Sequence, residues 1–238
     1  MQITMRPMTA DEAWQYLLVR YDKFKNLKKF GYGFEMWMPD LEPIKEMFTK
    51  PVLTDADKTG YEKIFRSYYD EKHLRVFDDV FNKDIKQKLE SAITKYLEPL
   101  LGVWNTKLPN SLEILCAYGR GGSYGMPDKN NHASITLRVS SMKQDPQGVF
   151  YVLFHEFVHL LIQKPIIEKY HVPQDLKERI VDIICLNFVN MPVQPRFKES
   201  FANNYINLDV IKNNLPKAVE KMMMDYNALN KQTQNSKD

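Results

Sequence analysis

The stretch that most constrains the fold is residues 145–163, with the sequence DPQGVFYVLFHEFVHLLIQ. Asp145 predicts a helix N-cap, and Pro146 stands at a first-turn position where proline is tolerated. Pro165 predicts the end of the helix. Residues 149–162 are apolar on nearly every face, so this helix is expected to lie inside the protein. The remaining elements must pack around it.

Three polar side chains interrupt the apolar run: His155, Glu156 and His159. Burying an unsatisfied polar group costs roughly 1–3 kcal/mol and an unpaired carboxylate far more, so these side chains need partners. The two histidines are four residues apart, so both imidazoles project from one face and can reach one metal ion. Glu156 lies about 100° around the helix, where its carboxylate can accept a hydrogen bond from a metal-held water. The alternative is a core helix whose histidines are satisfied by backbone or water.

A second helix, predicted at 173–189, contains a candidate third ligand. Eighteen residues separate His159 from Glu178, and Asp182 follows four residues later, so the two carboxylates share one helical face. Two histidines and a glutamate, with a fourth position open, are typical of catalytic rather than structural zinc. Asp182 could accept the second ring N–H of a ligating histidine. Requiring both carboxylates lowers the chance of a coincidental match to roughly 2 in 100,000.

The pattern HEFVH, eighteen residues, then ERIVD resembles the HExxH-(x)18-ExxxD pattern of the gluzincin zinc metallopeptidases. This group includes thermolysin-like enzymes and zinc aminopeptidases. The resemblance implies three zinc ligands: His155, His159 and Glu178. It also implies that Glu156 is the general base and that Asp182 is the partner of His155. The resemblance covers the two predicted helices and not the N-terminal hundred residues, so it indicates the group and no family within it.

The same resemblance suggests a substrate-binding strand. Residues 132–139, HASITLRV, alternate in polarity and predict a half-exposed strand. In gluzincins an antiparallel edge strand before the zinc helix binds extended substrate backbone. The candidates by position are Ala133, Ser134, Ile135 and Thr136. An exposed edge would offer unpaired N–H and C=O groups to a peptide. His132, at the start of this strand, is either a substrate contact, a strand cap or a solvent-exposed side chain.

Peptide hydrolysis also needs a donor for the oxyanion of the tetrahedral intermediate, and one such donor contributes about 3–4 kcal/mol. Thermolysin-like enzymes use a tyrosine from the connection between the two zinc-carrying helices and a histidine from farther along the chain. By that resemblance Tyr170 is the first candidate, and His171 and Tyr205 are the others. The alternative for Tyr170 and His171 is a surface pair in a loop.

The whole chain predicts an α+β fold that is mainly helical, with a zincin-like core and a small antiparallel or mixed sheet before the HExxH helix. Three regions are expected: an N-terminal helical region at 1–110, a catalytic core at 111–195, and C-terminal helices at 196–238 that end in a frayed tail from residue 230. Residues 119–125 are rich in glycine and predict a flexible loop, because they lack the Lys-Ser/Thr of a phosphate-binding loop.

Composition indicates an ordinary globular protein of 238 residues, 44% hydrophobic and 26% charged, which is enough to bury a core. A net charge of +3 predicts neither a nucleic-acid partner nor a membrane partner. Cys116 and Cys185 predict buried thiols, which suit a reducing compartment. Residues 1–12 lack a signal-peptide core, and no apolar stretch is long enough to span a bilayer. The expected location is cytoplasmic, with an exported mature form as the alternative.

The expected function is hydrolysis of peptide bonds in a peptide or protein substrate, with Zn²⁺ as the cofactor. Two other interpretations stand beside it. One is a catalytically silent zinc-binding protein with a regulatory or interaction role, and the other is a processing peptidase of narrow specificity with one protein target. The sequence indicates no oligomeric state.

Overall fold

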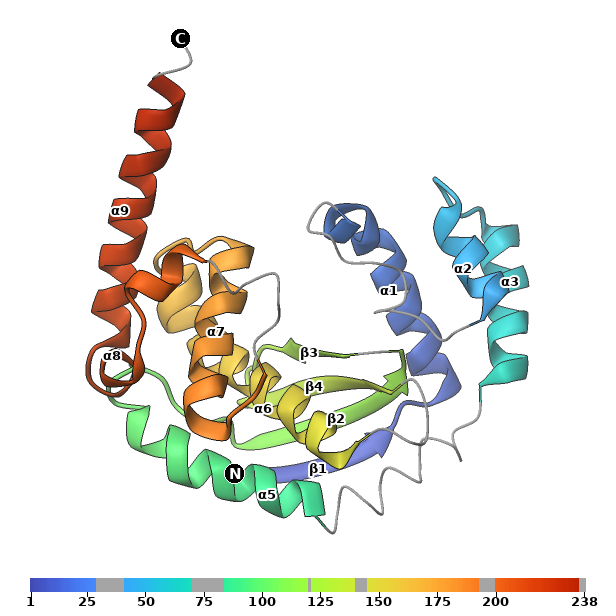
Figure 1. The fold of residues 1–238 in the computed structure, drawn as a ribbon. Helices are drawn as coiled ribbons and strands as arrows, with labels where there is room; N and C mark the ends of the chain where they lie inside the picture. Colours follow the sequence, from blue (N-terminus) through green and yellow to red (C-terminus); the bar gives the residue numbers. More distant parts are fainter. Residues whose placement is uncertain (29–40, 70–83, 120, 140–144, 193–199, 236–238) are drawn as a thin grey trace. The chain divides into compact units, whose positions relative to one another are not determined.

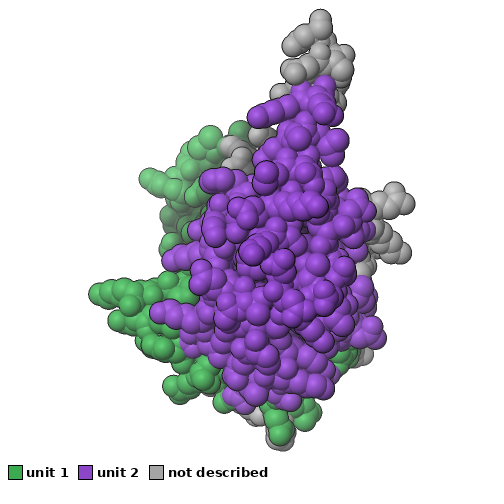
Figure 2. Space-filling view, turned by 90° about the vertical axis from the view of Figure 1, so that its left-hand side faces the viewer, with its two compact units in different colours: residues 1–87, 110–152 green, residues 88–109, 153–238 purple. Residues whose placement is uncertain are grey.

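The computed structural model describes residues 1–28, 41–69, 84–119, 121–139, 145–192 and 200–235. The chain forms two compact units, coloured separately in Figure 2. The first unit consists of residues 1–87 and 110–152, and the second of residues 88–109 and 153–238. One change of unit, between residues 109 and 110, lies next to the boundary predicted at 110. Residues 1–87 nevertheless belong to the same unit as residues 110–152, because the first residues of the chain form a strand of the sheet to which residues 111–139 contribute.

The first unit contains a four-stranded mixed sheet (Figure 1). Its strands are β1 (Gln2–Pro7), β2 (Ser111–Tyr118), β3 (Gly121–Gly125) and β4 (His132–Val139), in the order β1-β2-β4-β3. The β1–β2 and β2–β4 pairs are parallel, and the β3–β4 pair is antiparallel. The predicted fold class is confirmed at this level, since the described chain is mainly helical with a small mixed sheet.

The expectation of an exposed edge strand at the candidate substrate-binding residues is wrong, because β4 is an internal strand. Ser134, Ile135 and Thr136 pair with β2 on one side and with β3 on the other, and Ala133 pairs with β2. The strand is not half-exposed either, since Thr136 and Arg138 are buried together with the apolar positions. The edge next to β4 belongs to β3.

β3 is the glycine-rich segment, so the expectation of a flexible loop is also wrong for residues 121–125. The guanidinium of Arg138 donates to the carbonyl of Gly122 at 2.5 Å and to the hydroxyl of Tyr16 at 2.6 Å. Gly121 has a φ of +83°, and an added Cβ there would lie 3.4 Å from Arg138 Nη2. The positive φ therefore favours glycine at this position, where the strand lies next to a buried arginine.

The helices of the first unit are α1 (Ala10–Lys28), α2 (Glu42–Thr49) and α3 (Asp55–Tyr68). A capping box begins α1: Glu12 N–H donates to Thr9 Oγ1 at 3.2 Å, and Thr9 N–H donates to Glu12 Oε2 at 2.8 Å. Trp14 of α1 packs against Phe65 of α3, with ring centroids 5.8 Å apart. These helices form one apolar cluster together with Ala117 of β2.

The second unit is helical. It contains most of α5 (Lys86–Ala92), which continues through a π-helical turn (Ile93–Leu97) and a 3-10 turn (Glu98–Leu100). The long helix α6 (Pro146–Ile162) begins in the first unit and continues into the second. After it come a π-helical turn (Gln163–Glu168), α7 (Gln174–Val189), a 3-10 turn (Phe201–Asn204), α8 (Leu208–Asn213) and α9 (Leu215–Asn235).

The C-terminal ends of α6 and α9 differ from expectation, whereas the start of α6 agrees with it. The α6 start is as predicted, since the Asp145 carboxylate accepts hydrogen bonds from the N–H groups of Gln147 and Gly148 at 3.1 and 3.3 Å. Its α-helical part ends before Pro165, but the chain continues as a π-helical turn through that proline. At the C-terminus α9 runs to Asn235, so most of the predicted frayed tail is helical.

Both cysteines are buried, as predicted. Among the described residues, no helix combines the length and the apolar character that a membrane crossing requires.

Trp104 holds the end of the α5 segment to α8 in the second unit. Its side chain is fully buried, and its indole N–H donates to the carbonyl of Ile211 at 2.9 Å. Trp104→Ala should lower the free energy of unfolding by about 3–5 kcal/mol, because it leaves a large cavity. Trp104→Phe should lower it by about 1–3 kcal/mol, because the buried carbonyl loses its donor. Urea denaturation measures both values.

The matched control is Met224→Ala, which truncates a side chain of α9 that is 69% exposed and should change stability by at most about 0.5 kcal/mol. Equal effects at the two positions would contradict the assignment of Trp104 to the core.

Candidate metal centre

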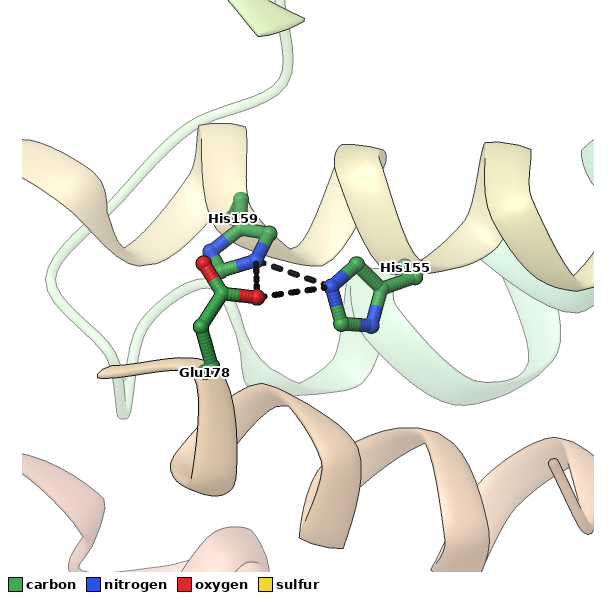
Figure 3. Close-up of side chains that lie close together, drawn as sticks. All are labelled: His155, His159 and Glu178. Carbon is green, nitrogen blue, oxygen red and sulfur yellow. Dashed lines mark hydrogen bonds and ion pairs between the residues drawn. The ribbon is translucent and has the colours of Figure 1, made fainter. Parts of the chain in front are cut away.

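Helices α6 and α7 bring together the three residues that the motif predicts as ligands. In Figure 3, His155 and His159 project from α6 toward Glu178, which projects from α7. The Nε2 atoms of the two histidines lie 2.9 Å apart. Glu178 Oε2 lies 3.3 Å from His155 Nε2 and 3.2 Å from His159 Nε2. All three side chains are buried, and together they could hold a metal ion.

The spacing of these three atoms fits a single metal ion. A triangle with sides of 2.9, 3.2 and 3.3 Å has a circumradius of about 1.8 Å, which is smaller than the Zn–N and Zn–O distances of roughly 2.0–2.2 Å. A point slightly above the plane of the triangle is therefore at bonding distance from all three atoms. Two imidazole nitrogens and one carboxylate oxygen suit zinc, and they also suit iron(II).

The three ligands differ in charge state. Burial lowers the pKa of His159 to about 4, so its imidazole is neutral at pH 7. Burial by itself would raise the pKa of Glu178, but the adjacent His159 and His155 hold it well below its ordinary value. Burial by itself would lower the pKa of His155, but hydrogen bonding with Cys185 and Glu178 raises it. A metal ion would therefore displace a proton from His155.

Two residues that the sequence analysis missed hold the outer oxygen of Glu178. The side-chain amide of Gln174 donates to Glu178 Oε1 at 2.6 Å, and the Lys177 ammonium lies 3.7 Å from the same oxygen. The other oxygen, Oε2, faces the histidines. Gln174 stands four residues before Glu178 on α7, so its position on the same helical face was available from the sequence.

The structure places Asp182 beside the second ring nitrogen of His155. Asp182 Oδ1 lies 3.4 Å from His155 Nδ1, and the aspartate side chain is buried. Asp182 and Glu178 are one turn apart on α7, and they lie near different ring nitrogens of His155. Asp182 lies near Nδ1, and Glu178 lies near Nε2. A carboxylate in this position fixes the tautomer of a ligating histidine and increases its basicity.

Glu156 lies next to His155 on α6, and its side chain is 9% exposed. Its charge contributes to the raised pKa of His155. It is not one of the three residues that converge on the common point. The role of Glu156 as the general base stays a prediction.

The three oxyanion candidates stay predictions, and the contacts described for them are with residues other than the three ligands. Tyr170 is half-buried beside Lys169, whose ammonium lies 4.9 Å from the centre of its ring. His171 is exposed, with a backbone φ of +52°. The Tyr205 hydroxyl donates to Asp225 Oδ2 at 2.8 Å. His132 is exposed at the start of β4 in the first unit.

No protein-family model matches the chain, and neither a curated protein nor a solved structure matches it. The likeness to gluzincins therefore rests on the spacing of the motif residues in the sequence. The convergence of His155, His159 and Glu178 is a separate observation, made in space.

We expect the protein to bind one divalent metal ion per chain, because three buried donor atoms converge on one point. Glu178→Ala should abolish stoichiometric binding, since it removes one of three ligands. Asp182→Asn should lower the affinity by about 10–100-fold, because it weakens the support of His155. Isothermal titration with zinc and metal analysis after dialysis measure both effects.

Glu220→Ala is the control, since Glu220 is exposed on α9. A Glu178→Ala protein that keeps one tightly bound ion per chain would show that the cluster is not the metal site.

Proposed function

We propose that the protein is a zinc-dependent metallopeptidase with a zincin-like catalytic core. The observation that carries this proposal is the convergence of His155, His159 and Glu178 on one point, with a further buried carboxylate, Glu156, beside the first ligand. Two histidines and one glutamate form the ligand set of catalytic zinc sites, in which the fourth position stays open for water or substrate. The HExxH-(x)18-ExxxD spacing supports the same conclusion.

Zinc is preferred over iron(II) because of what surrounds the ligands. A buried glutamate next to a ligand histidine is the arrangement in which a general base serves hydrolysis. Asp182 beside His155 Nδ1 adds the carboxylate that commonly supports a zinc-bound histidine. When bound here, zinc would lower the pKa of a coordinated water toward 7 and would polarise a substrate carbonyl.

We assign proton transfer and the orientation of the ligands to other residues of this chain. Glu156 accepts a proton from the attacking water and later returns it to the nitrogen that leaves when the peptide C–N bond breaks. Asp182 holds the imidazole of His155 in one orientation. Gln174 holds the outer oxygen of Glu178, so that this carboxylate presents Oε2 to the histidines. The buried surroundings exclude bulk water and strengthen each of these electrostatic contacts.

Glu156→Gln tests the proposed reaction. The amide is nearly isosteric but cannot accept the proton at neutral pH, so turnover should fall by at least about 100-fold. Zinc content should stay at one per chain, because Glu156 is not one of the converging ligands. Cleavage of a mixed peptide library, followed by mass spectrometry, gives the rate and the bonds cut.

The control is Glu220→Gln, which makes the same chemical change at an exposed position of α9. Near-wild-type turnover in Glu156→Gln would refute the assignment of the base. A zinc-loaded wild-type protein that cleaves neither the library nor folded proteins would instead favour a catalytically silent zinc-binding protein.

A further inference from the structure

A hollow of about 480 Å³ lies in the first unit, between one face of α1 and the connection from α2 to α3. Leu18, Val19 and Asp22 line it from α1, where their spacing of three and four residues places them on one helical face. Val52 and Leu53 line it from the connection. Pockets that bind ligands typically enclose roughly 300–1,000 Å³, so this hollow has room for side chains of a partner.

Contacts within the first unit hold the walls of the hollow in place. The Tyr21 hydroxyl donates to the carbonyl of Lys50 at 2.8 Å and so joins α1 to the connection. The Lys50 ammonium donates to Asp57 Oδ1 at 2.5 Å and so joins the connection to α3. Leu53 is buried in the apolar cluster of the three helices. The hollow is therefore preformed, and a partner would not have to order its walls on binding.

Aliphatic side chains on both walls are exposed to solvent. Val19 of α1 is 49% exposed, Val52 of the connection is 71% exposed, and Leu18 is half-buried between them and the core. A single exposed apolar side chain is common on protein surfaces, but these three line the same hollow. Exposed apolar side chains that are grouped and rimmed by polar residues are typical of interaction surfaces.

Asp22 gives the hollow a carboxylate that is not neutralised by an ion pair. The Lys50 ammonium lies 2.5 Å from Asp57, and the Lys58 ammonium lies 3.4 Å from Asp55, so both of these lysines have carboxylate partners. Asp22 is exposed and makes no ion pair with any residue that the structure describes. One negative charge of the hollow therefore remains for a cation from a partner.

The basic neighbours of Asp22 along α1 lie outside the hollow. The Arg20 guanidinium lies 4.9 Å from the centre of the Tyr16 ring, and neither Arg20 nor Lys23 lines the hollow. Burial raises the pKa of Tyr21, and the charge of Asp22 raises it further. The charge of Asp22 thus acts on the wall of the hollow that α1 forms.

We propose that this hollow docks an extended segment of another protein that carries a lysine or arginine two residues from an aliphatic side chain. Side chains two residues apart project from the same side of an extended segment. The basic side chain lays its aliphatic stem against Val19 and Val52 and directs its charged end to Asp22. The inference concerns the first unit and does not depend on the proposed function, because the candidate metal ligands belong to the second unit.

The test uses the full chain with its leucine and valine methyl groups labelled for NMR. Every protein in it carries Glu156→Gln, so that a peptidase activity cannot consume the probe. The probe is an acetylated and amidated peptide of sequence GLSRSLG. It should shift the methyl signals of Leu18, Val19 and Val52. A charge-reversed peptide, GLSESLG, and a peptide without aliphatic side chains, GSSRSSG, should each bind at least about threefold more weakly.

Two substitutions test the two parts of the recognition. Asp22→Lys should reverse the preference, so that GLSESLG binds more tightly than GLSRSLG, because the unpaired charge changes sign. Val52→Ser should weaken GLSRSLG by at least about threefold, because it removes an aliphatic wall. The matched controls are Glu220→Lys and Met224→Ser on α9, where Met224 is 69% exposed, and both should bind the peptides as the unsubstituted hollow does.

Both test substitutions replace exposed side chains, and the remaining methyl spectrum verifies the fold of each variant. No shift of the three methyl signals up to the solubility limit of GLSRSLG would overturn the proposal. Equal affinities for GLSRSLG and GLSESLG, or an unchanged preference in Asp22→Lys, would also overturn it. Shifts of the same signals with protein concentration alone would show that a second copy of the chain occupies the hollow, which would replace the proposed partner.

Discussion

The second unit depends on how four buried ionisable side chains of α6 and α7 are satisfied. His155, His159, Glu178 and Asp182 lie inside a helical core, where an isolated charge would be strongly unfavourable. They lie against one another because the two helices present their i, i+4 faces at the same level. One turn of displacement along either helix would leave carboxylates facing apolar side chains. The cluster therefore specifies the register of α6 against α7.

The groups that support this cluster lie on two sides of it. Closest to the histidines is the Oε2 atom of Glu178, behind it are the amide of Gln174 and the ammonium of Lys177, and Asp182 stands on the far side of His155. Each supporting residue belongs to α7. Helix α7 thus carries one ligand together with the groups that orient it. Its N-terminal part determines how the carboxylate of Glu178 is oriented.

Particular residues show why some elements were predictable and others were not. The capping residue Asp145 acts on N–H groups within three residues of itself, and its role was predicted correctly. The strand β1 was missed although residues 2–6 alternate between polar and apolar side chains, because its pairing partner β2 lies far along the chain. β3 was taken for a loop because its glycines have low strand propensity. In the structure the carbonyl of Gly122 accepts a hydrogen bond from the buried Arg138, and sequence patterns do not reveal this long-range contact.

The sequence by itself determined the candidate ligands, because the i, i+4 spacings of His155 and His159 and of Glu178 and Asp182 follow from helical periodicity alone. Only the tertiary structure decided that these two faces meet and which oxygen of Glu178 faces the histidines. It also decided that β4 is internal and β3 is an edge. The physical reason is that side-chain direction along one element is a local property, whereas contact between elements depends on packing of the whole core.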